Sequence, residues 1–88
     1  MKTSNNICIN RKPVVLDRMG ISKSTFYERL NKGLIPPSIS LGERAVGWLE
    51  HEITLLINAM AAGYSEADLQ SLIKDMVENR QQELEQLM

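Results

Sequence analysis

Two adjacent prolines, Pro36 and Pro37, divide this 88-residue chain into parts that must fold differently. Proline lacks a backbone N–H and clashes with the preceding helical turn, so no helix runs through this pair. Beyond the prolines, apolar residues alternate with a period of two on both sides of a turn at Gly42-Glu43. This alternation is typical of paired strands, and it predicts a β-hairpin within residues 34–48.

The residues before the prolines carry the signals of two short helices joined by a tight turn. Pro13 suits the first residue of a helix, where an N–H would have no intrahelical partner, and Gly20 suits a left-handed cap at its end. Ser22 is a candidate N-cap for the second helix, which Lys32 and Gly33 close. These signals predict a helix-turn-helix, with an ordinary pair of packed helices as the alternative. The apolar positions of this region are Val14, Val15, Leu16, Met19, Ile21, Phe26 and Leu30.

Helical spacing returns after the hairpin, from Leu49 to Met60, with Trp48 as the expected core anchor before it. Ser65 is a candidate N-cap for a last helix with an acidic first turn. We expect this helix to pack on the rest of the chain, with association between copies as an addition. Its apolar residues are Leu69, Leu72, Ile73, Met76, Val77, Leu84 and Leu87.

The net charge of -1 conceals an asymmetry between the two halves of the chain. Residues 1–50 contain eight Lys and Arg against four Asp and Glu, whereas residues 51–88 contain two against seven. The first half therefore carries +4 and the second -5. This contrast indicates that the basic half contacts a polyanion and that the acidic half faces water or a protein partner.

The start of the second predicted helix has the chemistry to contact DNA. In a helix-turn-helix this end enters the major groove, and its unpaired N–H groups and helix dipole attract phosphate oxygens. At the hairpin tip, a glycine lets the backbone approach DNA, and the neighbouring arginine can reach the minor groove. The alternative is that Arg44 is a solvent-exposed turn residue without a binding role, with Glu43 as its ion partner. The predicted DNA-binding residues are Ser22, Lys23, Ser24, Thr25, Tyr27, Arg29, Gly42 and Arg44.

The sequence resembles the AlpA family over about residues 11–62. The resemblance rests on GISKSTFY at residues 20–27, PPSISLGER at 36–44 and AVGWLE at 45–50. Its most specific part, from Leu41 to Glu50, looks like the family's Leu-Gly-x-Arg followed by a small residue and Val-Gly-Trp. Family members often carry a basic residue where this chain has Glu28, so Arg29 is expected to replace that contact.

The resemblance implies a MerR-like or excisionase-like winged helix-turn-helix, with the second helix in the major groove and the hairpin as wing. It also implies regulation of integrase or excision genes in a mobile element, or a recombination directionality factor that bends attachment-site DNA. The fold class we expect is therefore mainly α, with a short hairpin wing and an additional C-terminal helix. Its parts would be a flexible segment over residues 1–10, the DNA-binding domain over 11–64 and an acidic helix over 65–88.

Several other functional classes find no support in the sequence. Cys8 and His51 are the sole cysteine and histidine, and no phosphate-binding or dinucleotide motif occurs. We therefore expect no catalytic residue, no metal and no cofactor. Without an apolar run of about 18 residues to cross a bilayer, we expect a cytoplasmic, nucleoid-associated protein of a bacterial host.

Double-stranded DNA at a promoter or an attachment site is the expected partner. A homodimer or a cooperative array on DNA, and contact with an integrase or another protein, stay open from sequence. The alternative function is a protein-interaction module that acts on a host or phage protein through the acidic C-terminal helix.

Overall fold

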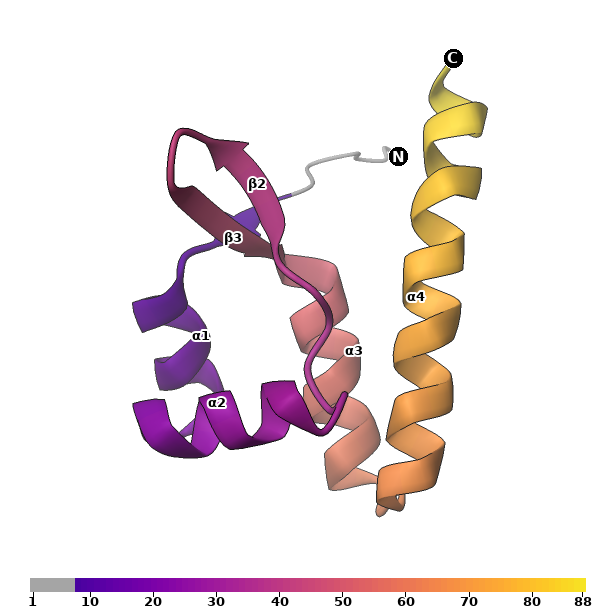
Figure 1. The fold of residues 1–88 in the computed structure, drawn as a ribbon. Coiled ribbons are helices and arrows are strands. Elements are labelled where there is room, and N and C mark those ends of the chain that lie inside the picture. Colours follow the sequence, from indigo (N-terminus) through magenta and orange to yellow (C-terminus); the bar gives the residue numbers. More distant parts are fainter. Residues whose placement is uncertain (1–7) are drawn as a thin grey trace.

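The computed structural model describes residues 8–88 of the chain. Its hairpin stands above the helix pair α1 and α2, α3 follows directly from the hairpin, and α4 runs along α3 (Figure 1). This arrangement confirms the predicted class, a small and mainly helical winged helix-turn-helix with an added C-terminal helix. The elements are β1 (Ile9–Asn10), α1 (Lys12–Met19), α2 (Lys23–Asn31), β2 (Ile39–Gly42), β3 (Ala45–Leu49), α3 (Glu50–Ala61) and α4 (Glu66–Leu87).

Local signals set the ends of the helices. Gly20 ends α1 in the left-handed conformation, at a φ of 67°. Ser22 caps α2 by accepting a hydrogen bond from the N–H of Thr25 at 3.2 Å, and Ser65 caps α4 in the same way. Pro13 lies one residue later than expected, because α1 begins at Lys12, but it is still in the first turn, where its missing N–H costs nothing.

The sheet contains a strand that the sequence analysis did not foresee. It has the order β1-β3-β2, and all its strands are antiparallel. Ile9 pairs with Leu49 and Asn10 with Trp48, and Asn10 is buried. The expected loose segment over residues 1–10 therefore does not extend to Ile9 and Asn10, and its residues 1–7 lie outside the described residues.

The hairpin turns one residue later than expected. Glu43 and Arg44 are its central residues and both have positive φ values, 39° and 50°. In the ladder, Ile39 lies opposite Gly47, so these two share the sheet face that points away from the neighbouring Trp48.

One buried cluster joins the hairpin and the four helices. Val15, Phe26 and Ile53 have no exposed surface, and the ring of Trp48 meets that of Phe26 edge-on with 5.3 Å between centroids. The predicted role of Trp48 as a core anchor is thereby confirmed. The predicted packing of the last helix is confirmed too, since α4 adds three side chains to the cluster: Leu69, Ile73 and Met76.

The apolar stripes on two helices are narrower than expected. Val14 on α1 and Val77 on α4 are exposed, by 45% and 41%. The core instead gains Leu34 and Ile35 from the loop after α2. Within residues 8–88, no helix is both long enough and apolar enough to span a membrane.

Candidate nucleic-acid interface

The start of α2 is exposed and carries hydroxyl and cationic groups. Ser22, Lys23 and Ser24 are exposed, whereas Thr25 is half-buried. The Ser22 hydroxyl accepts from the N–H of Thr25 and donates to Thr25 Oγ1 at 3.0 Å. The hydroxyls of Ser22 and Thr25 therefore organise the helix start, and Lys23 and Ser24 present their side chains next to it.

Tyr27 lies one turn after Lys23 and has a partner from α1. Tyr27 is 40% exposed, and the Lys12 ammonium lies 4.7 Å from its ring centroid and donates a hydrogen bond to the phenol oxygen. This hydrogen bond is the main reason why the pKa of Tyr27 is lower than usual. Sequence reasoning missed Lys12, because its approach to a residue 15 positions later depends on how α1 packs against α2.

Arg29 lies on a different side of α2. Tyr27 and Arg29 are two residues apart, so they project from roughly opposite sides of the helix. The Arg29 guanidinium points toward Met60 of α3, with Nη1 3.8 Å from Sδ, and is half-buried. It lines a hollow between α2 and the α3-α4 pair, together with Lys32 and Tyr64. The structure thus does not bring Arg29 together with Lys23 and Tyr27.

The wing tip is exposed at Gly42, Glu43 and Arg44. Positive φ values at both central residues are those of a tight hairpin turn, a conformation that glycine and asparagine adopt at lower cost than arginine. Within residues 8–88 the ion pairs join His51 to Glu83 and Arg80 to Glu52, so Arg44 is not paired with Glu43.

Arg18 is one of the cations that make the first half of the chain basic, but its role is structural. Its guanidinium donates to Asn10 Oδ1 at 2.8 Å, to the Glu50 carbonyl at 3.3 Å and to Thr54 Oγ1 at 2.6 Å. It thereby ties α1 to β1 and to the start of α3. The positive charge of α2 and the wing comes instead from exposed residues such as Lys23 and Arg44.

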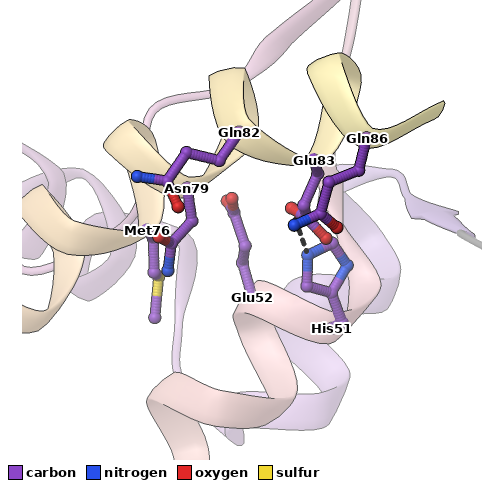
Figure 2. A pocket seen from close by; sticks show the side chains of 7 residues that line it. All are labelled: His51, Glu52, Met76, Asn79, Gln82, Glu83 and Gln86. Carbon is purple, nitrogen blue, oxygen red and sulfur yellow. Dashed lines mark ion pairs between the residues drawn. The ribbon is translucent and has the colours of Figure 1, made fainter. Parts of the chain in front are cut away.

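A separate hollow lies between the first turn of α3 and the C-terminal half of α4 (Figure 2). His51 and Glu83 form an ion pair across it at 3.7 Å when the histidine is protonated, and both side chains are almost half exposed. His51 lies on the exposed surface of α3. Among the residues that the structure describes, no three His, Cys, Asp or Glu side chains are grouped to hold a metal ion.

Residues 9–59, which run from β1 into α3, match the family model described as "Prophage CP4-57 regulatory protein (AlpA)". The chain belongs to the AlpA family of prophage regulatory proteins. A relative from Enterobacteria phage P4, called "Uncharacterized protein ORF88", is 43% identical over 53 residues.

The AlpA resemblance inferred from the sequence is thereby confirmed. The aligned residues make up 60% of this chain and 60% of the phage P4 protein, so the chain covers less than two thirds of that relative. No solved structure matches the chain significantly. The AlpA match contains α1, α2 and the wing but ends before α4.

Proposed function

We propose that this AlpA-family protein binds double-stranded DNA with α2 and the wing and so regulates genes of a mobile element. One observation carries the proposal: the N-terminal end of α2 and the wing tip both lie on the side of the molecule away from α4 (Figure 1). The exposed cations Lys23 and Arg44 belong to that side, whereas the acidic helix is remote from it. A polyanion is thus attracted more strongly to this side of the molecule than to α4.

In this proposal the start of α2 enters the major groove. Lys23, Ser24 and Tyr27 contact phosphates or base edges, while Ser22 and Thr25 hold the helix end that faces a phosphate. Gly42 lets the wing approach the duplex, and Arg44 reaches the minor groove or its rim. Arg29 contributes positive charge from the side of α2. No step requires a catalytic group, a metal or a cofactor.

The AlpA family suggests two outcomes for such binding. One is regulation of the transcription of integrase or excision genes from a promoter. The other is a recombination directionality factor that acts at an attachment site, as a dimer or array on DNA or together with an integrase. The position of the bound sequence separates the two outcomes.

The test is binding to short duplexes from nearby promoters and from any adjacent attachment site, against scrambled DNA. About five phosphate contacts would reduce affinity by roughly two to three decades between 50 and 200 mM salt. Tight, selective and salt-dependent binding supports the proposal, and its location distinguishes promoter control from excision. Weak binding that is equal on all sequences would reject it.

Single substitutions then test the assigned surface. Lys23→Ala and Arg44→Ala should each weaken binding by about tenfold or more, the loss of one charge-assisted contact. Lys74→Ala is the matched control, because it removes an exposed cation from α4. If neither Lys23→Ala nor Arg44→Ala changes affinity, the assigned site is wrong.

A second candidate function is a protein-interaction module at the end of α4. Leu84 and Leu87 are 51% and 63% exposed near the C-terminal end of this helix. Leu84→Asp and Leu87→Asp would then abolish activity in cells and leave DNA affinity intact. Unchanged activity in both variants would count against a protein partner at this position.

A further inference from the structure

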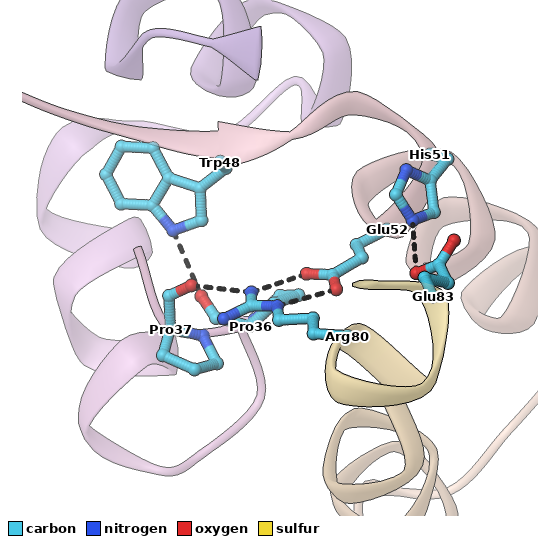
Figure 3. A network of polar contacts seen from close by, with 7 residues as sticks. All are labelled: Pro36, Pro37, Trp48, His51, Glu52, Arg80 and Glu83. Carbon is cyan, nitrogen blue, oxygen red and sulfur yellow. Dashed lines mark hydrogen bonds and ion pairs between the residues drawn. The ribbon is translucent and has the colours of Figure 1, made fainter. Parts of the chain in front are cut away.

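A single side chain of α4, that of Arg80, holds the base of the wing. Its Nε and Nη2 donate to the two carboxylate oxygens of Glu52, at 2.8 and 2.6 Å. Nη2 also donates to the backbone carbonyl of Pro37 at 2.9 Å. The three groups meet on the side of α3 that faces α4 (Figure 3).

These partners lie at the two ends of the hairpin. Pro37 lies two residues before Ile39, the first residue of β2, and Glu52 lies in the first turn of α3, which continues directly from β3. One guanidinium therefore connects both strands of the wing to α4. Glu52 is 2% exposed, so the ion pair is shielded from solvent on the carboxylate side.

The loop before β2 depends on such side-chain contacts. Neither Pro36 nor Pro37 has an N–H to donate. Their carbonyl oxygens are held by two different elements: Trp48 Nε1 of β3 donates to Pro36 at 3.0 Å, and Arg80 of α4 donates to Pro37 (Figure 3). The path from α2 into the wing is thereby fixed at two consecutive residues.

We propose that Arg80 is a positioning residue that sets the orientation of the wing relative to α2. The proposal rests on the proposed function in one respect, since the purpose of the orientation is to present Arg44 to DNA. It makes α4, which lies outside the segment matched by the AlpA family, a part of the DNA-binding unit.

The core remains when Arg80 is lost. Leu69, Ile73 and Met76 attach α4 to the buried cluster, and Trp48 stays in that cluster with its bond to Pro36. Removal of Arg80 alone would leave the Glu52 carboxylate buried and unpaired, which destabilises a protein strongly. The informative variant therefore replaces both partners, as Glu52→Leu with Arg80→Met. Lys74→Met on the same helix is the control.

The first measurement uses the free protein. Residual dipolar couplings of backbone amides report the orientation of β2 and β3 relative to α1 and α2. In the Glu52→Leu, Arg80→Met protein we expect the couplings of β2 and β3 to change in value or to become smaller through motional averaging. The couplings of α1 and α2 should stay the same as in the wild-type protein. Unchanged wing couplings would overturn the proposal, whether or not the protein binds DNA.

The second measurement is a double-mutant cycle on DNA affinity. If the wing is misplaced, Arg44→Ala should cost about tenfold in the wild-type background but less than about twofold in the variant without the pair. Lys23→Ala should cost the same in both backgrounds. A full Arg44→Ala effect in the variant would overturn the proposal. Absence of selective DNA binding by the wild-type protein would instead reject the proposed function, and the dipolar couplings would still decide whether Arg80 orients the wing.

Discussion

Lys12 holds its ammonium group 4.7 Å from the ring centroid of Tyr27 and donates a hydrogen bond to the phenol oxygen. The contact joins the first turn of α1 to an exposed side chain of α2. The pKa of Tyr27 is lower than the usual 10.0, mainly because of this hydrogen bond. The charges of Lys12 and Lys23 lower the pKa further, whereas desolvation of the phenol raises it.

Lys12→Met should therefore return the pKa of Tyr27 toward 10.0. Because the pKa is lower in the folded than in the unfolded chain, the folded state binds fewer protons between the two values, and the free energy of unfolding rises with pH through that window. The rise should disappear in Lys12→Met. Ultraviolet titration of the phenol in a Tyr64→Phe background measures the pKa, with Lys74→Met as control. An equal pKa with and without Lys12 would contradict the contact.

Ser22→Ala and Ser65→Ala form a matched pair of cap variants. Each removes a hydroxyl that accepts an N–H of the first helical turn, at 3.2 Å in both cases. Each should lower the free energy of unfolding by about 1 kcal/mol in urea denaturation. Only Ser22→Ala should also weaken DNA binding, because α2 and not α4 faces the duplex in our proposal. Equal effects of both variants on affinity would argue against that orientation.

Arg44→Gly should make the protein more stable and less able to bind DNA. Arg44 has a φ of 50°, and glycine avoids the cost of about 1 kcal/mol that other residues incur in this conformation. The free energy of unfolding should rise by a similar amount while affinity falls as in Arg44→Ala. Glu43→Asn is the control, since it eases the same turn and keeps the arginine. If Arg44→Gly kept full affinity, Arg44 would have no role in binding.

Gly47→Ala should destabilise the sheet. A Cβ at this position would lie 2.4 Å from Ile9 Cγ2 and 3.3 Å from the Asn10 carbonyl oxygen, so the Ile9 side chain or β1 itself would have to shift. Overpacking of this kind costs about 1 to 3 kcal/mol. Adding Ile9→Ala removes the clashing methyl group, so the double variant should lose less than the sum of the two single losses. Simple additivity in thermal unfolding would show that β1 does not pack over Gly47.

Much of the fold follows from signals within a few consecutive residues, which can be recognised in the sequence. Gly20 and Ser22 specify the turn between α1 and α2, because left-handed caps and N-caps are properties of a few consecutive residues. Pro36 and Pro37 prevent a helix for an equally local reason. The position of Trp48 between the alternating pattern and a helical pattern was enough to predict its burial.

The candidate site was only partly predictable. Exposure of Lys23, Ser24 and Arg44 follows from their places at a helix start and a turn. Arg29 has the same chemistry as a DNA-contacting residue, but which side of α2 it occupies depends on where Phe26 faces the core and where α3 lies. Lys12 could not be found from sequence, since its partner Tyr27 belongs to another helix.

The helices, the hairpin and the basic half of the chain could be predicted from the amino-acid sequence, because they depend on periodicity, caps and charge within short segments. The strand at Ile9 and Asn10 and the contacts of Arg80 with Glu52 and Pro37 arise only when distant segments pack together. A strand of two residues has no periodicity of its own and exists only because β3 offers an edge. Likewise, a buried ion pair across 28 positions becomes favourable only after packing of α4 on α3 has brought the two charges together and removed water.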